Sequence, residues 1–204
     1  MHASDGQARP LLLWRLPEPM VAITSAPLGG GLGLRGWVVN AQVAKAYARV
    51  DVEDHLQKIA LAAGANGTGV GMLTAARVDD RAAAMDGGVH SFATVGLTAP
   101  TWASDAAVKA GSSRVGTINV VAFLPVRLSD AALVNAVMTV TEAKTQALLE
   151  AKVPGTGTAS DAVCVLCSAS GHGETFGGPR SPWGGRLARA VHGAVARGIR
   201  EVAR

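Results

Sequence analysis

The fold class is decided by residues 116–124, Gly116-Thr117-Ile118-Asn119-Val120-Val121-Ala122-Phe123-Leu124, and by the segment that begins Ser129-Asp130-Ala131-Ala132-Leu133. The first segment is a short apolar run rich in β-branched residues, which predicts a buried strand. Ser129 is a good N-cap residue and is followed by an acidic residue at the first helical position, so a helix is expected from there to about Ala151. This strand and helix indicate an α/β or α+β protein: a single-domain layered sandwich with a mixed β-sheet and helices packed on it.

Similar patterns in the rest of the chain predict further elements around this unit. A helix is expected over 51–63, and a C-terminal amphipathic helix from 183 or 184. Strands are expected at 11–16, 19–25, 36–40, 67–75, 89–98, 117–126 and 161–169, with a proline-containing turn between the first two. Irregular segments are expected at 27–33, 79–88, 101–113, 154–160 and 170–182. We predict a disordered tail over 1–10 and one domain over 11–204.

Composition limits the classes of function. Of 204 residues, 49% are hydrophobic and 17% are charged, which is typical of a folded domain and not of a disordered chain. The net charge of +4 comes largely from arginines near the C-terminus, and no aromatic stacking platform accompanies them, so nucleic acid is not an expected partner. No apolar run is long enough for a membrane span and no signal peptide is evident, so we predict a cytoplasmic protein.

Cys164 and Cys167 form a Cys-x-x-Cys pattern, which elsewhere binds zinc or performs redox chemistry. Here the pattern lies in a predicted strand, where residues three apart point to opposite faces. Two thiols so placed cannot share a metal ion. We therefore expect inert buried thiols and no metal site.

Several polar side chains occur inside otherwise apolar elements. Thr117 and Asn119 lie in the predicted strand, and Thr141-Glu142-Ala143-Lys144 lies in the long helix. An unpaired buried polar group costs about 1–3 kcal/mol, so such residues need partners or a function. On the helix, Glu142 and Lys144 are two residues apart and lie on different faces. A solvated helix face with ordinary charges is the competing interpretation, and the pattern alone favours it.

Two loops also carry candidate groups. Gly29-Gly30-Gly31-Leu32-Gly33 lacks the residues of a nucleotide-binding loop and is interpreted as a mobile turn or as backbone that touches a ligand. Asp161 stands where a Gly/Thr-rich loop enters a strand. It is expected to cap backbone amides, with a role as acid or base as the alternative.

Taken in chain order, the sequence motifs resemble the adenosylcobinamide amidohydrolase family, CbiZ, over about residues 20–202. The motifs are Thr24-Ser25-Ala26-Pro27-Leu28-Gly29-Gly30-Gly31, Asn40, Val70-Gly71-Met72-Leu73-Thr74-Ala75-Ala76, Ala93-Thr94-Val95-Gly96-Leu97, Gly116-Thr117-Ile118-Asn119, Thr141-Glu142-Ala143-Lys144 and Gly157-Thr158-Ala159-Ser160-Asp161-Ala162. Ser160 departs from the threonine expected before the aspartate, but it keeps a hydroxyl group.

The resemblance implies a corrinoid-salvage enzyme. Such an enzyme hydrolyses the amide between the corrin ring side chain and aminopropanol, and releases adenosylcobyric acid and 1-amino-2-propanol. Cobalt is carried by the corrinoid substrate, so no protein cofactor is implied, and a homo-oligomer is left open. A non-catalytic corrinoid-binding or carrier protein is the alternative, and an acyltransferase is a third interpretation.

Two catalytic hypotheses accompany the resemblance. In the first, Glu142 activates water, Asn40 or Asn119 donates to the oxyanion, and Lys144 or Asp161 assists. In the second, a threonine hydroxyl at 74, 117 or 158 is the nucleophile, in one version after chain cleavage at that residue. The substrate is expected to contact Ser25, Gly30, Gly31, Thr74, Thr94, Thr117, Thr141 and Thr158.

Overall fold

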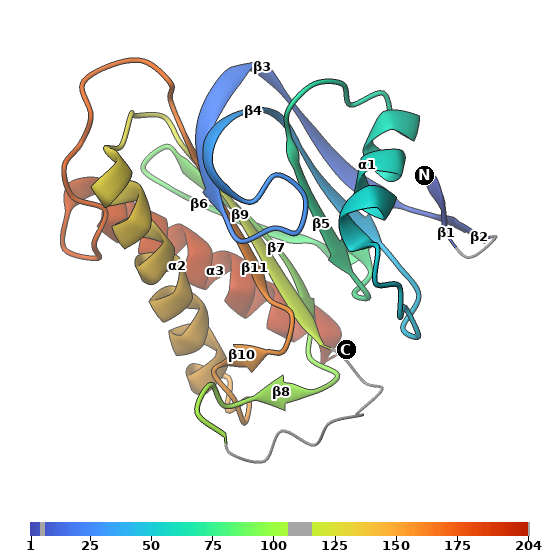
Figure 1. The fold of residues 1–204 in the computed structure, drawn as a ribbon. Coiled ribbons are helices and arrows are strands. Elements are labelled where there is room, and N and C mark those ends of the chain that lie inside the picture. Colours follow the sequence, from blue (N-terminus) through green and yellow to red (C-terminus); the bar gives the residue numbers. More distant parts are fainter. Residues whose placement is uncertain (5–6, 106–115, 204) are drawn as a thin grey trace.

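A seven-stranded mixed sheet with helices packed on it forms the body of the protein, which confirms the predicted fold class (Figure 1). The computed structural model describes residues 1–4, 7–105 and 116–203. The strand order is β5-β4-β3-β11-β9-β7-β6. The strands are β3 (Leu11–Thr24), β4 (Gly31–Gln42), β5 (Val70–Thr74), β6 (Ala82–Asp86), β7 (Val89–Gly96), β9 (Thr117–Leu124) and β11 (Ala162–Cys167).

The described residues form three α-helices beside the sheet: α1 (Val52–Ala62), α2 (Asp130–Glu150) and α3 (Pro182–Val202). The Ser129 hydroxyl accepts a hydrogen bond from Ala132 N at 3.2 Å, so the predicted N-cap of α2 is confirmed. The part of the chain that the structure describes also contains two small strand pairs, β1 (His2–Ser4) with β2 (Gln7–Arg9) and β8 (Pro100–Thr101) with β10 (Gly157–Thr158). None of the described helices is long and apolar enough to cross a membrane.

The β3–β4 ribbon is bent, and the bend sets the shape of the sheet. The predicted turn near Pro17 was wrong, because residues 11–24 form one strand with a register shift between Arg15 and Met20. Such an irregularity bends a strand and increases its local twist. The C-terminal end of β3, residues 21–24, pairs with β11. Its N-terminal end, residues 11–14, pairs with β4 residues that also pair with β5 on their other side. The sheet therefore curls, and its inner face lies between two groups of strands.

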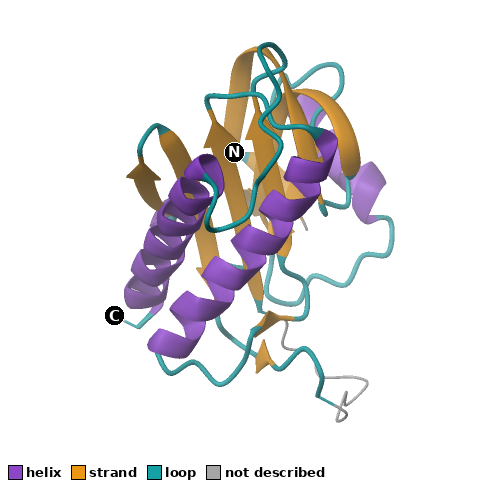
Figure 2. Ribbon diagram, turned by 90° about the vertical axis from the view of Figure 1, so that its left-hand side faces the viewer, coloured by secondary structure: helices purple, strands orange, loops and turns teal. Residues whose placement is uncertain are grey.

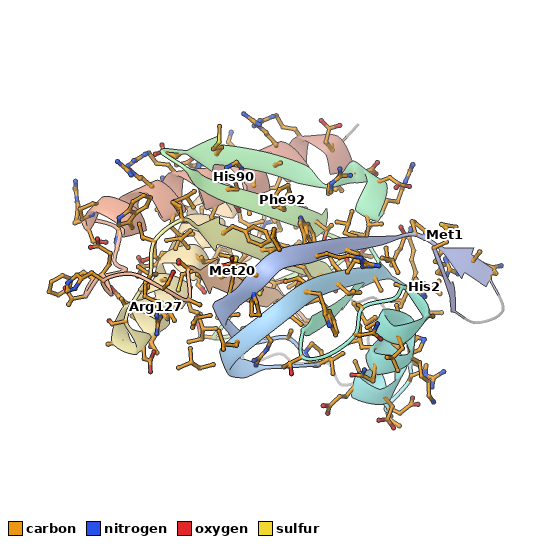
Figure 3. The ribbon with its side chains drawn as sticks, turned by 90° about the horizontal axis from the view of Figure 1, so that it is seen from above. Met1, His2, Met20, His90, Phe92 and Arg127 are labelled. Carbon is orange, nitrogen blue, oxygen red and sulfur yellow. The ribbon has the colours of Figure 1, made fainter. Side chains whose placement is uncertain are left out.

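Three groups of buried side chains follow from this curl. On the outer face, β7, β9 and β11 pack against α2 and α3, which lie side by side across the strands (Figure 2). Elsewhere on the outer face, Val39 and Ala41 of β4 pack against α1, on the side of the molecule away from α3 (Figure 3). The inner face is closed by residues such as Val38, Met72 and Val121.

An aromatic cluster joins the strands across the inner face. Phe92 of β7, labelled in Figure 3, has its ring centroid 5.4 Å from that of Trp14 on β3 and 6.1 Å from that of Phe123 on β9. Strands that are not neighbours in the sheet therefore meet through their inner side chains.

Some predicted boundaries differ from the structure. Residues 79–88, expected to be a polar turn region, contain most of the 3₁₀ helix η1 (Val78–Asp80) and all of β6. β6 was missed because Ala82-Ala83-Ala84 has low strand propensity and is paired by its neighbour β7. The loop expected over 101–113 lies partly outside the described residues. Strands β1 and β2 occupy the segment predicted to be a disordered tail.

Candidate active site

A cavity of about 290 Å³ lies at one end of the curled sheet, between β5, β9, the loop after β4 and the start of α1. Three residues predicted from sequence line it, namely Thr74, Thr117 and Asn119. Ser160 also contributes, and three residues that sequence reasoning missed, Lys45, Tyr47 and Arg49, come from the loop after β4. Apolar walls are supplied by Pro27, Val43, Ala44, Val52, Leu73, Ala75 and Ala162.

A buried chain of side-chain amides crosses the curled sheet beside this cavity. Asn40 Nδ2 donates to Thr94 Oγ1 at 3.0 Å, and Asn119 Nδ2 donates to Asn40 Oδ1 at 2.9 Å. Asn119 Nδ2 also donates to the Leu73 carbonyl oxygen at 2.9 Å. Asn40 and Asn119 are each 1% exposed. The structure thus brings together Asn40, Thr94 and Asn119, which come from β4, β7 and β9.

Hydroxyl groups form the part of the cavity wall near the start of β9. Ser160 Oγ donates to the Gly116 carbonyl oxygen at 3.0 Å, and Thr117 Oγ1 lies 2.7 Å from Ser160 Oγ. Because the Ser160 proton goes to a carbonyl, Thr117 is the donor of this second bond. Thr74 Oγ1 accepts a hydrogen bond from Ala76 N at 3.1 Å. No acceptor for the Thr74 proton occurs among the residues that the structure describes, so this proton can be donated to a ligand.

Lys144 and Asp161 form an ion pair on the other face of the sheet. Asp161 Oδ1 accepts hydrogen bonds from Ile118 N at 2.9 Å and from Thr158 Oγ1 at 2.5 Å, while Oδ2 accepts from Thr158 N at 3.2 Å. The expectation that Asp161 caps backbone amides is confirmed. Neither Lys144 nor Asp161 is among the described residues that line the cavity. Thr158 is likewise engaged with Asp161 and does not line the cavity.

Glu142 and Thr141 lie on the exposed surface of α2. Glu142 lines a separate hollow between α2 and α3, together with Gln146, Arg189 and His192. Thr141 Oγ1 donates to the Val137 carbonyl of its own helix at 3.0 Å. The structure therefore does not bring Glu142 to Asn40 or Asn119, because α2 covers the outer face and the amides lie on the inner face. The first catalytic hypothesis does not fit this geometry.

Hydrogen bonds fix the loop between β3 and β4, which contains Gly29 and Gly30 and leads into Gly31 at the start of β4. Ser25 Oγ accepts from Val163 N at 3.0 Å, which ties the end of β3 to β11. The Arg35 guanidinium donates to the Gly29 carbonyl at 2.8 Å and to that of Gly30 at 3.4 Å. Gly31 has a φ of +87°, a conformation that favours glycine. Of residues 25–31, Pro27 reaches the cavity wall.

A tyrosine–histidine pair adjoins the cavity. The Tyr47 hydroxyl is 2.9 Å from His55 Nδ1, and the two rings stack with centroids 5.6 Å apart. His55 is 6% exposed and belongs to α1. Sequence reasoning found no partner for this histidine because Tyr47 lies in a loop, where no periodicity links it to α1. The short separation of eight residues was the available signal.

The two cysteines lie on opposite faces of β11, as expected. Cys164 belongs to the inner core and Cys167 to the outer core, and both are free thiols. Burial raises the pKa of the Cys164 thiol to about 12. Among the described residues, no group of three or more His, Cys, Asp or Glu side chains is placed to hold a metal ion.

The fold and the site define a class of protein, an α/β protein with a largely apolar cavity whose wall carries a few hydroxyl and amide groups. Comparison with known proteins gives the family. The family model described as adenosylcobinamide amidohydrolase, CbiZ, matches residues 1–203, and the chain belongs to this family.

Two curated relatives agree with the family assignment. The chain is 30% identical over 184 residues to the adenosylcobinamide amidohydrolase of Methanosarcina mazei, covering 86% of this chain and 88% of the relative. It is 41% identical over 80 residues to the adenosylcobinamide amidohydrolase of Halobacterium salinarum, covering 39% of this chain and 34% of that protein.

Proposed function

We propose that this protein is an adenosylcobinamide amidohydrolase. It hydrolyses the amide between the corrin ring side chain and aminopropanol, and it releases adenosylcobyric acid and 1-amino-2-propanol for corrinoid salvage. The family match over residues 1–203 is the observation that carries this proposal. The cavity beside the Asn40–Asn119 amide chain is the place where we put the reaction.

The size of the cavity indicates which part of the substrate enters it. A volume of about 290 Å³ is at the lower end of the roughly 300–1,000 Å³ of typical ligand pockets. A corrin macrocycle with its axial ligands does not fit such a space, whereas its aminopropanol arm does. We therefore place the arm and its amide inside the cavity and the ring outside, against the cavity mouth.

Tyr47 and His55 are the acid–base pair of the proposed reaction. None of the described residues that line the cavity is Asp, Glu or His, so proton transfer is assigned to the Tyr47 hydroxyl with His55 Nδ1 behind it. Water attacks the amide carbon and gives a proton to the Tyr47 oxygen, while Tyr47 passes its own proton to His55. The reverse transfer protonates the nitrogen as the C–N bond breaks, which leaves an acid and an amine.

The developing oxyanion needs hydrogen-bond donors in the same cavity. Thr74 is 1% exposed, lines the cavity and has its own hydroxyl proton free, so it donates to the substrate carbonyl oxygen. Lys45 lies at the exposed margin of the cavity and adds a positive charge there. Thr74 was predicted to contact the substrate or to act as the nucleophile, and here it takes the role of a hydrogen-bond donor.

Thr117 is the alternative nucleophile. Unlike Thr158 it lines the cavity, but its proton is donated to Ser160 and not to a base. If Thr117 attacked, the Thr117→Ala variant would lose all turnover while Thr117→Ser kept part of it. The intact mass of the purified protein tests the version that requires chain cleavage, since a single full-length mass rules that version out.

The proposed function is tested by incubating the purified protein with adenosylcobinamide and separating the products by chromatography. Adenosylcobyric acid and aminopropanol are the expected products. A carrier protein would return the corrinoid unchanged, and that result would overturn the proposal. Competition between water and an added amine would instead indicate an acyltransferase.

The remaining sequence-based expectations stay predictions. They are the absence of a protein cofactor, with cobalt carried by the substrate, a cytoplasmic location, no binding of nucleic acid, and the open alternative of a homo-oligomer. Size-exclusion chromatography with light scattering tests the oligomeric state. A filter-binding assay with labelled RNA and DNA tests the nucleic-acid prediction.

A further inference from the structure

The side-chain amide of Asn119 has one hydrogen-bonding atom without a partner. Its nitrogen carries two hydrogens, and both are used, for Asn40 Oδ1 and for the Leu73 carbonyl. Its oxygen Oδ1 is buried and accepts no hydrogen bond from the residues that the structure describes. Asn119 therefore has no donor left for an oxyanion, which was the role predicted from sequence. What it can offer to a ligand is an acceptor.

The orientation of this amide follows from its neighbours. The Leu73 carbonyl oxygen can only accept, so the group that faces it at 2.9 Å must be the nitrogen. The opposite orientation would place two oxygens against each other at Leu73. It would also leave the Asn119 nitrogen unpaired. The hydrogen-bond network thus assigns Oδ1 as the free atom.

A buried acceptor without a partner is costly, since it loses its hydration and gains nothing in return. The cost is about 1–3 kcal/mol. Asn119 is 1% exposed and is one of the described residues that line the cavity. A donor on a ligand that approached the amide from the cavity would remove this cost. Because Oδ1 is neutral, the natural complement is a neutral N–H or O–H group.

We propose that Asn119 Oδ1 accepts a hydrogen bond from the N–H of the amide that is cleaved. This inference rests on the proposed function, and it makes Asn119 the residue by which the enzyme selects a secondary amide over an ester. An ester places an oxygen where the N–H would be, and that oxygen cannot donate. The acceptor then stays unpaired, and such mismatches give strong discrimination between substrates. After cleavage the same nitrogen still carries hydrogens, so the contact also holds the departing amine.

The test compares two substrates on three proteins. The substrates are adenosylcobinamide and its ester analogue, in which oxygen replaces the N–H of the aminopropanol linkage. The measured quantity is the ratio of kcat/KM for the amide to kcat/KM for the ester, since comparing this ratio between proteins cancels the intrinsic reactivity of the ester. In Asn119→Leu, which is similar in volume but has no acceptor, the ratio is expected to fall about tenfold relative to the natural protein.

Asn40→Leu is the matched control. Asn40 is equally buried and belongs to the same amide chain, but it is not among the described residues that line the cavity. This substitution disturbs the scaffold and is expected to lower both rates while leaving the ratio unchanged. An unchanged ratio in Asn119→Leu, or an equal fall in both variants, would overturn the inference.

A measurement on the natural protein covers the case in which Asn119→Leu does not fold. The N-methylated amide has no N–H, and its KM is expected to be at least about tenfold higher than that of adenosylcobinamide. An equal KM for the two compounds would overturn the role of Oδ1. If the natural protein hydrolyses neither the amide nor the ester, then the proposed function itself has failed, which is a different result.

Discussion

Lys144 of α2 and Asp161 before β11 form an ion pair that lies behind the cavity wall, on the helix-covered face of the sheet. Asp161 also binds the backbone nitrogen of Ile118, whose neighbours Thr117 and Asn119 face the cavity. The pair therefore holds the segment that carries Ser160 against the strand that carries Asn119. Both residues were predicted to be catalytic; neither is among the described residues that line the cavity, and we expect a positioning role for them.

Removal of the lysine should destabilise the protein. The Lys144 side chain is 9% exposed and that of Asp161 is 12% exposed, so Lys144→Met leaves a largely buried carboxylate without its cation. Breaking such a pair costs about 3 kcal/mol. Urea unfolding measures the change in the free energy of unfolding. Lys58→Met, at an exposed position of α1, is the control and should change it little; equal stability of the two variants would contradict the positioning role.

Tyr47→Phe should slow the reaction without weakening substrate binding. The variant keeps the ring that stacks on His55 but removes the hydroxyl that lies 2.9 Å from His55 Nδ1. A fall in kcat of about 10² or more is expected, with KM nearly unchanged, because proton transfer is lost. Initial rates of aminopropanol release provide the measurement.

His55→Gln should behave like Tyr47→Phe, since it removes the other half of the pair. His192→Gln is the matched control, because His192 lies in the hollow between α2 and α3 and bonds Glu150. If the substitution at His192 slowed the reaction as much as that at His55, the acid–base assignment would be wrong.

Glu142→Gln should retain activity. Its carboxylate is exposed on α2, on the side of the sheet away from the cavity, so no step of the proposed reaction uses it. We expect kcat/KM within about twofold of the natural protein, because a surface substitution changes the free energy of unfolding by no more than about 0.5 kcal/mol and leaves the cavity intact. Loss of turnover with the fold intact by circular dichroism would return Glu142 to the mechanism and move the site to the hollow between α2 and α3.

The buried thiol of Cys164 should make stability fall at high pH. Its pKa is raised to about 12 by burial, whereas the thiol of an unfolded chain has a pKa near 8.5. Below about pH 8.5 the thiol is neutral in the folded and in the unfolded state, and its contribution to the free energy of unfolding is fully present. Between about pH 8.5 and pH 12 the thiol ionises in the unfolded state but not in the folded state, so this contribution is lost. The difference in unfolding free energy between the natural protein and Cys164→Ala should shrink over this range. A pH-independent difference would contradict the prediction.

The order of elements could be predicted from sequence because each strongly patterned segment carries its own signal. The capping side chain of Ser129 predicts the start of α2, and the apolar run after Thr117 predicts β9. β6 was not predicted because its alanines have no strand preference of their own, and they are held in the sheet by pairing with β7. Local propensity is a weak guide where a neighbouring strand decides.

The site could be predicted only in part. Asn119 was singled out because a polar group in an apolar strand needs a partner, whereas Asn40 and Thr94 were expected in the site from the family resemblance. The structure shows that the three residues are hydrogen-bonded to one another. Which face of the sheet each residue occupies could not be read from sequence, since it depends on the register of long-range strand pairs. This is why Glu142 was placed with the amides, whereas Tyr47 was missed because it lies in a loop without a periodic pattern.

The bend in the β3–β4 ribbon has a consequence for how activity is acquired. Asn40 and Asn119 are 79 positions apart along the chain, and they meet because that ribbon folds over the inner face. The described residues that line the cavity are themselves spread from Pro27 to Ala162, so no short contiguous fragment can contain the reaction centre. Activity should therefore appear only in the last, cooperative stage of folding. In denaturant it should be lost together with the circular dichroism signal of the folded protein, and no partly folded species should be active.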